Sequence, residues 1–438
     1  MNNARTQIEE LREFLRLPSA SGDPDGLRRT ADWLTARLRS GGWQVVVDDS
    51  GIAPPLLAAE RGNGPLVAVY SHYDVVNPLR SEWQHDPFGA DLVNNRVIAC
   101  GARDAKANLL GAVEAGEATE GARLLLLFEG EEKRESPRLL AFVRQALAGR
   151  LPVGFLCADG GGYTDRDEPT MELGLKGQLA LKIEVDAGTA GVPPTSIHSG
   201  HAALAVNPND VLVRFLASLK DTADRVTLDG FYAGVRPPER PYREPLDAGE
   251  ASFLRTLFAR YGYSLRPGEK PAEVFNRLMF QPELNIASVR SGETGLENRI
   301  VPARTSARLD VNLVPGQEPE QVLAAVRRRL QEYGIEAERS LHMLAARPAY
   351  RCPPEDPFAV AAREALAETH PDKPVIVLPS SGSSGPVSGL PRTFGRPLGR
   401  LGTGYRGHAH TPDEAVKVEH YGLYIATLRT FFGRVAVL

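Results

Sequence analysis

The chain has 438 residues, enough for two or three domains of ordinary size. Apolar residues make up 42% and charged residues 24%, and a net charge of −4 without a long charged block argues against nucleic acid or an anionic membrane as the main partner. The three cysteines fit neither a disulfide framework nor a closed thiolate zinc site. No stretch approaches the roughly 20 apolar residues of a membrane span, and no apolar signal-peptide core is present, so we expect a cytoplasmic protein.

Two amphipathic helices are predicted near the start of the chain, each with four apolar side chains on one face. These side chains are Ile8, Leu11, Phe14 and Leu15 in the first helix and Leu27, Ala31, Leu34 and Leu38 in the second. The second helix is expected to end at Gly41-Gly42. Apolar runs at 66–70, 124–128 and 153–158 follow, and their length and position between helical segments indicate buried strands of an α/β sheet.

A different pattern begins after Gly177. It predicts strands at 179–185, 285–289, 307–314 and 341–346 and helices at 211–219 and 322–330. The order β-α-β-β-α-β is that of a ferredoxin-like unit. A segment rich in proline and arginine at 235–246 is predicted to be a loop within this unit. We therefore expect a discontinuous catalytic domain (1–177 and 351–438) with a second domain inserted at 178–350.

Polar side chains follow each of the predicted buried strands. In open α/β sheets, ligands bind beyond the carboxyl ends of the strands, so we expect these side chains to share one edge. Carboxylates and an imidazole gathered there require a cation between them, which favours one divalent metal, or two that share a carboxylate, and zinc accepts such ligands. The candidates are His72, Asp74, Asp104, Glu129, Glu131, Glu132, Asp159 and, near the C-terminus, His410.

Each of these motifs also has an ordinary structural interpretation. His72 and Asp74 could form a surface pair or a cap, the acidic residues 129–132 could be a solvated turn, and Asp159 could begin a glycine turn. Independent surface carboxylates have no reason to follow successive apolar strands, however. Their joint placement therefore favours the metal site.

Motifs in a fixed order cover nearly the whole chain. They are Phe14-Leu15-Arg16-Leu17-Pro18-Ser19, His72-Tyr73-Asp74-Val75-Val76, Trp83 with Asp86-Pro87-Phe88, Asp104-Ala105-Lys106, Glu129-Gly130-Glu131-Glu132, Ile197-His198-Ser199-Gly200, Val314-Pro315-Gly316-Gln317 and His410-Thr411-Pro412-Asp413-Glu414. With these motifs the chain resembles the zinc amidohydrolase family that includes carboxypeptidase G, carnosinase-type dipeptidases, aminoacylases, acetylornithine deacetylase and succinyl-diaminopimelate desuccinylase. The resemblance implies a zinc-exopeptidase-like catalytic domain with an inserted ferredoxin-like lid and dimerisation domain.

The resemblance also implies a site with two divalent metal ions, zinc or alternatively cobalt or manganese, bridged by Asp104. The remaining ligands would be His72 and Asp159 for one ion and Glu132 and His410 for the other, with His408 as a rival to His410. Asp74 would orient His72, and Glu131 would be the general base that takes a proton from the attacking water and delivers it to the leaving nitrogen.

Four further residues receive roles from the same resemblance. His198 would reach across a homodimer to stabilise the oxyanion in the partner's site, or else make only a local hydrogen bond in its loop. Ser384 would contact substrate, or lie in a plain tight turn. Asn312 stands where related enzymes place an arginine for the substrate carboxylate, and Arg299 either compensates or is a solvated charge.

Departures from the family pattern affect loops rather than metal ligands. Ala107 replaces a glycine, and Lys133, Arg134 and Glu135 follow the paired glutamates. The predicted function is hydrolysis of an amide bond in a dipeptide or small peptide-like substrate. Deacylation of an N-acyl amino acid by the same residues is the alternative, and a non-catalytic binding protein is a second alternative, which the complete set of site residues disfavours.

Overall fold

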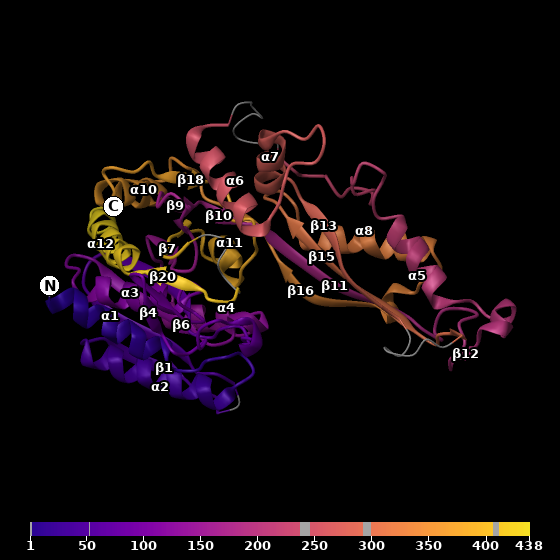
Figure 1. Cartoon of the computed structure of the whole chain (residues 1–438), viewed down its shortest axis with the longest axis horizontal. Coiled ribbons are helices and arrows are strands. Elements are labelled where there is room, and N and C mark those ends of the chain that lie inside the picture. Colours follow the sequence, from indigo (N-terminus) through magenta and orange to yellow (C-terminus); the bar gives the residue numbers. More distant parts are fainter. Residues whose placement is uncertain (1, 52, 237–245, 292–298, 406–410) are drawn as a thin grey trace.

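The structure is a computed structural model that describes residues 2–51, 53–236, 246–291, 299–405 and 411–438. The molecule is elongated and has two lobes (Figure 1). The larger lobe contains both termini and is called the catalytic lobe after the expectation from the sequence. The smaller lobe, called the lid lobe on the same ground, includes the described residues 177–236, 281–291 and 299–350. Within the described ranges, no helix is long and apolar enough to cross a membrane.

The catalytic lobe is built on one large mixed sheet. Its strand order is β1 (Gln44–Asp48), β2 (Leu56–Gly62), β6 (Arg123–Glu129), β3 (Leu66–His72), β7 (Gly154–Cys157), β19 (Leu398–Arg400), β9 (Pro169–Glu172) and β18 (Ile376–Leu378), with β8 (Gly162–Tyr163) paired to β9. The predicted strands at 66–70, 124–128 and 153–158 are confirmed as β3, β6 and β7. They run parallel, so their carboxyl ends meet at one edge, as expected.

Alternate residues of the central strands pack on opposite faces of this sheet, because side chains alternate along a strand. Val67 and Val69 face a core that includes the two predicted N-terminal helices, whereas Ala68 and Tyr70 face a smaller core. The first face is covered by α1 (Asn2–Leu15), α2 (Pro24–Ser40), α3 (Lys106–Glu117), α10 (Pro357–Thr369) and α12 (Val418–Val435). The second face is covered by α4 (Leu139–Leu147) and α11 (Leu390–Phe394).

Short elements complete the catalytic lobe. They are η1 (Arg80–Glu82), η2 (Glu132–Arg134), η4 (Pro386–Gly389), the small sheet of β4 (Asp91–Val93), β5 (Arg96–Ile98) and β20 (Ala415–Lys417), and the pair β10 (Gly174–Leu175) with β17 (Tyr350–Arg351). The β10–β17 pair lies where the chain passes between the two lobes, so both connections to the lid leave from one place.

The lid lobe has the predicted β-α-β-β-α-β order. Its antiparallel sheet runs β13 (Glu283–Ser291), β15 (Thr305–Leu313), β11 (Gly177–Val185) and β16 (Leu341–Arg347). Inward residues of the central strands, such as Leu309 and Val311, form one core with α5 (Pro208–Ala217), α8 (Pro319–Glu332) and α9 (Ala337–Ser340). The far end holds the β12 (Ile197–His198) and β14 (Ile300–Val301) ladder and η3 (Ser199–Leu204).

The segment between α5 and β13 contains two helices that the sequence analysis did not predict. The expected loop at 235–246 falls almost entirely outside the described residues, but α6 (Ala248–Tyr261) and α7 (Pro271–Phe280) follow it. Phe253 and Phe275 of these helices pack with Ile376 of β18 in one apolar cluster. The insertion therefore rests on the catalytic lobe, although its sequence interrupts the lid (Figure 1).

Candidate metal centre

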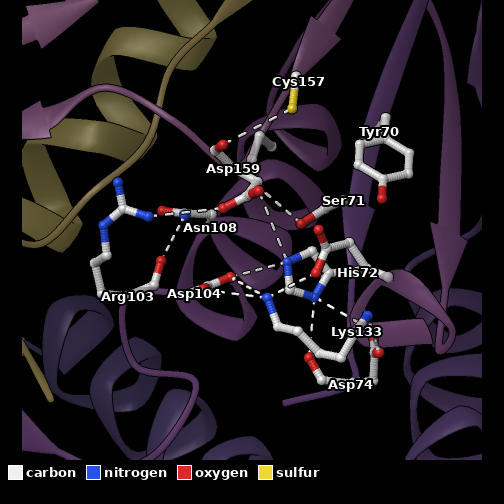
Figure 2. A network of polar contacts seen from close by, with 12 residues as sticks. Tyr70, Ser71, His72, Asp74, Arg103, Asp104, Asn108, Lys133, Cys157 and Asp159 are labelled. Carbon is white, nitrogen blue, oxygen red and sulfur yellow. Dashed lines mark hydrogen bonds and ion pairs between the residues drawn. The ribbon is translucent and has the colours of Figure 1, made fainter. Parts of the chain in front are cut away.

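His72 ends β3 at the edge where the parallel strands terminate, and its side chain is fully buried. Its Nδ1 lies 2.9 Å from the backbone oxygen of Asp74 and 3.4 Å from that residue's Oδ1. Because a carbonyl oxygen can only accept, Nδ1 carries a proton and donates it to Asp74. This leaves Nε2 as the free ring nitrogen, oriented toward Asp104 and Asp159 (Figure 2).

Two carboxylates converge on that nitrogen. His72 Nε2 lies 3.0 Å from Asp104 Oδ1 and 3.8 Å from Asp159 Oδ2. One ligand atom from each of these three side chains lies within 4.8 Å of the others, as a shared metal ion requires. Asp104 comes from the loop before α3, and Asp159 follows β7, so three separate segments build the cluster.

The electrostatics of the cluster favour a cation at its centre. Burial and Lys133 oppose a positive charge on His72, but the carboxylates of Asp104 and Asp74 outweigh them and raise the pKa of the imidazole. Burial and the neighbouring Asp104 raise the pKa of Asp159. The protonated forms of both His72 and Asp159 are thus favoured. A divalent metal ion would take the place of those protons.

The three side chains therefore fit a divalent metal. His72 Nε2 is buried and makes no hydrogen bond of good geometry with any described residue, although it faces two carboxylates. One imidazole nitrogen with carboxylate oxygens is a donor set that zinc, cobalt and manganese accept. The second carboxylate oxygen of Asp74 accepts a hydrogen bond from the backbone N–H of Lys133, which fixes the carboxylate that orients His72.

The side chains of the paired glutamates, Glu131 and Glu132, contact different partners. Glu132 begins η2, and its Oε2 lies 2.7 Å from the Lys133 ammonium, which also lies 3.0 Å from Asp104 Oδ1. Glu131 is buried, and its Oε2 accepts a hydrogen bond of 2.8 Å from Arg138. Glu131 does not line the cavity described below, so its predicted function as a base requires its carboxylate to turn away from Arg138.

The predicted ligand His410 and its rival His408 lie outside the described residues. Glu414 of the same motif is described, and its carboxylate accepts hydrogen bonds from the backbone N–H groups of Arg103 and Asp104, at 2.6 and 2.9 Å. Burial and the nearby Asp104 raise the pKa of Glu414 to about 7. Glu414 of this motif thus holds the Asp104 loop in place.

A cavity of about 460 Å³ opens beside the cluster. Ser384 lines it together with Asp104, Glu132 and Asp159, so this predicted substrate contact lies next to the candidate metal ligands. Another part of the lining is apolar and comes from the inserted helices α6 and α7. Its side chains are Phe253, Leu257, Tyr261 and Leu278.

Two arginines in this cavity were missed by the sequence analysis. Arg400 Nη1 lies 2.5 Å from Glu172, its Nη2 donates to the backbone oxygen of Asp159, and Arg103 Nη1 lies 3.7 Å from the Asp159 carboxylate. Both side chains line the cavity, and that of Arg400 is buried, whereas that of Arg103 is partly exposed. A signal for Arg400 was present, because it ends a short apolar run and so occupies the carboxyl end of a strand next to β7.

Three predicted residues lie away from the cavity. His198 and Arg299 are exposed at the far end of the lid, where Ser199 N donates to the backbone oxygen of Arg299 (Figure 1). Asn312 is half-buried on β15, opposite Gln178 on β11 and Glu283 on β13. The structure thus brings together the described candidate ligands His72, Asp104, Glu132 and Asp159 with Ser384, but not these three residues.

Comparison with known proteins gives consistent matches. The chain is 28% identical over 260 residues to a cysteinylglycine-S-conjugate dipeptidase of Corynebacterium striatum, an alignment that covers 55% of this chain and 54% of the relative. It is also 28% identical over 233 residues to a succinyl-diaminopimelate desuccinylase of Acidiphilium cryptum, covering 52% and 58%. The chain spans about half the length of the curated relatives it matches.

Solved structures match over the whole chain. An M20 family metallo-carboxypeptidase of Sulfolobus solfataricus superposes with a TM-score of 0.88 at 26% identity, covering 99% of both chains. Human carnosine dipeptidase 1 shares the fold, with a TM-score of 0.80 at 20% identity and coverage of 99% and 97%. The sequence profile of a peptidase family matches residues 68–434. The chain therefore belongs to peptidase family M20/M25/M40.

Proposed function

We propose that the protein is a metal-dependent hydrolase that cleaves an amide bond in a dipeptide or small peptide-like substrate. The observation that carries this proposal is the convergence of His72, Asp104 and Asp159 at one sheet edge beside a cavity of about 460 Å³. The family membership and the names of the similar proteins, which include dipeptidases and a metallo-carboxypeptidase, support it. The predicted cytoplasmic location remains part of the proposal.

The proposed cofactors are two divalent metal ions, zinc in the first instance, with cobalt or manganese as alternatives. His72 and Asp159 would hold one ion, Glu132 and His410 the other, and Asp104 would bridge them. A structure with 13% identity to this chain is described as a dinuclear metal-binding peptidase of the same family, which is consistent with two ions. When bound, the metal would polarise the amide carbonyl and make a water nucleophile available near neutral pH.

The protein's own residues then divide the remaining work. Asp74 keeps the His72 ring in the tautomer that leaves Nε2 free. Glu131 accepts the proton of the attacking water and returns it to the leaving nitrogen. For this, its carboxylate must break the hydrogen bond with Arg138 and turn toward the cavity. Ser384, which lines the same cavity as the candidate carboxylate ligands, contacts the substrate.

His198 is proposed to act on the oxyanion of the partner subunit in a homodimer formed through the lid. The backbone N–H of Gly200 donates to His198 Nδ1 at 3.0 Å, so Nδ1 is unprotonated and Nε2 carries the hydrogen. The exposed edge of the ring is therefore a hydrogen-bond donor, as stabilisation of an oxyanion requires. Its position at the far end of the lid supports a site shared between subunits.

The substrate is proposed to carry an apolar group, because the cavity that the candidate carboxylate ligands line is also lined by Phe253, Leu257, Tyr261 and Leu278. N-acyl amino acids are the second candidate substrates, since several relatives are desuccinylases. The test is a hydrolysis screen of apolar dipeptides against N-acyl amino acids, using protein reconstituted with zinc, cobalt or manganese. No hydrolysis with any of the metals would refute the proposal.

The substrate's free carboxylate is proposed to be gripped weakly, because Asn312 offers only a neutral amide where related enzymes have arginine. Loss of a charge-assisted contact costs about tenfold or more in affinity. Plain dipeptides should therefore be poorer substrates than their C-terminal amides. A kcat/KM that favours the free acid would point instead to Arg299 or to the cavity arginines Arg103 and Arg400.

A further inference from the structure

Lys133 inserts a positive charge into the candidate metal centre. Its Nζ lies 3.0 and 3.2 Å from the two carboxylate oxygens of Asp104 and 2.7 Å from Glu132 Oε2. Its backbone N–H also donates to Asp74. The side chain is 9% exposed, so this ammonium is shielded from water and lies directly among the site's carboxylates (Figure 2).

This ammonium contacts one carboxylate that belongs to the second half of the site alone. Glu132 is assigned only to the second metal ion, whereas Asp104 is the ligand that the two ions would share, and Lys133 contacts both. Asp159, assigned to the first ion, is approached instead by Arg103 and Arg400, each at 3.7 Å. The ammonium therefore contacts both proposed carboxylate ligands of the second ion but only the shared carboxylate of the first.

An ammonium group and a metal ion cannot occupy the same place. Lys133 donates hydrogen bonds to the oxygens that the second ion would need, and its charge already offsets theirs. Binding of the second ion must therefore break at least two short charge-assisted contacts and move the ammonium. The side chain has a place to go, because Lys133 itself lines the open cavity.

We propose that Lys133 is a built-in cation that competes with the second metal ion for Asp104 and Glu132. The first ion binds tightly at His72, Asp104 and Asp159, and the second binds only when the lysine side chain swings into the cavity. The protein thus holds one ion at low metal concentration and two at high concentration. This inference rests on the metal site of the proposed function but concerns its occupancy, not the reaction.

The experiment measures bound metal rather than activity. Full-length protein is freed of metal with a chelator and dialysed against a series of free cobalt concentrations, and the cobalt bound per chain is measured by elemental analysis. We expect wild type to bind one equivalent tightly and a second at least about tenfold more weakly. Lys133→Met should tighten the second equivalent by about tenfold or more, and the first by less, because Asp104 is the one proposed ligand of the first ion that the ammonium contacts.

Two further variants control the result. Lys182→Met removes a lysine that pairs with Glu184 at 2.9 Å in the lid, far from the site, and should match wild type. Lys133→Arg keeps the charge and should keep the second ion weak. Two equivalents of equal affinity in wild type would overturn the inference, and so would a Lys133→Met curve that superimposes on that of wild type.

The wild-type titration decides the question even if Lys133→Met fails to fold, which its thermal unfolding would reveal. Failure of this inference is distinguishable from failure of the proposed function. A protein that binds cobalt in two unequal steps but hydrolyses no amide supports the inference and refutes the function. A protein with two sites of equal affinity that hydrolyses dipeptides refutes the inference and supports the function. A protein that binds no cobalt refutes both the inference and the proposed function.

Discussion

The two lobes differ in how they treat charge. The catalytic lobe buries charged side chains in several places, among them Asp74, Lys106, Glu114, Glu129 and Arg400. Among the described residues of the lid lobe, no charged side chain is buried, and the core consists of residues such as Leu309 and Val311. Burying charge is costly unless it is compensated, so it marks the lobe in which the chemistry resides.

The two lobes contribute different properties to the protein. Leu309 and its neighbours contribute stability by removing apolar surface from water, and the lid's polar candidates, His198 and Arg299, lie exposed at its tip. The buried charges of the catalytic lobe are held by specific partners, such as Tyr70 and Ser136 around Glu129, whose pKa burial raises to about 8. Substitutions in the two lobes should therefore fail in different ways.

The largest expected effect is on turnover, in the catalytic lobe. Glu131→Gln keeps the shape of the side chain but cannot accept a proton, so kcat should fall by about 10²–10⁴-fold while metal content stays normal. Glu135→Gln, which changes a carboxylate four residues away that pairs with Arg347, is the matched control and should remain active. Near-wild-type turnover by Glu131→Gln would remove this residue from the mechanism.

The next effect tests whether the lid tip belongs to another subunit's site. His198→Ala alone should lower kcat by about 10²–10³-fold if the imidazole stabilises an oxyanion. Mixed in equal amounts with Glu131→Gln, it should recover about a quarter of wild-type activity, because half of the dimers are mixed and each has one complete site. Subunit exchange without recovery of activity would argue that His198 does not act in trans.

A stability effect without a metal effect is expected in the lid core. Leu309→Ala should lower the free energy of unfolding by about 2–5 kcal/mol, because Leu309 is fully buried in a central strand. Val289→Ala on the neighbouring strand changes a side chain that is 52% exposed and should cost less than about 0.5 kcal/mol. Urea titrations measure the free energy of unfolding of both variants. Loss of metal by folded Leu309→Ala would contradict the separation of stability and metal binding between the two lobes.

The smallest effect concerns the pH dependence of stability. Burial raises the pKa of Glu114 to about 7, and its carboxylate accepts hydrogen bonds from Gln7 and Tyr421. The folded state therefore binds this proton more tightly than the unfolded state, and the stability that it contributes is lost as pH rises from about 4.5 to about 7. Glu114→Gln should make that decline shallower by about 1–3 kcal/mol in urea titrations.

Glu332→Gln serves as the control for this pH series, because its carboxylate lies in the lid, is exposed and pairs with an arginine, Arg329, a residue type that does not titrate in this range. We expect it to leave the decline between pH 5 and 7 as it is in wild type. An equal change of slope in both variants would show that the pH dependence does not arise from buried charge in the catalytic lobe.

The sequence predicted the elements whose patterns are local and regular. The two N-terminal helices, the parallel strands and the ferredoxin-like order followed from apolar periodicity. The edge that His72 and Asp159 share followed from their places at strand ends, and Asp104 joins them from the loop before α3. The helices α6 and α7 were missed, since α6 has only a weak apolar stripe and follows a proline-rich segment. Their stability comes from contact with β18, which no local pattern reveals.

The missed site residues share a different cause. Lys133 was recognised as a departure from the family pattern, but its place between Asp104 and Glu132 depends on the turn of η2 and on a loop 29 residues away. Arg103 and Arg400 approach Asp159 only because distant segments meet at the sheet edge. Periodicity in the sequence identifies on which face of a helix or strand a residue lies. These contacts depend instead on the conformations of separate loops.

The inserted helices α6 and α7 give the protein an exchangeable part. They supply most of the apolar wall of the cavity, yet none of the candidate metal ligands lies within their stretch of chain. An evolutionary change or an engineered swap confined to residues between α5 and β13 can therefore alter which substrates are accepted and leave the reaction chemistry untouched. The apolar lining residues of the cavity and the candidate metal ligands thus lie in different segments of one polypeptide, so the two sets can change independently in evolution.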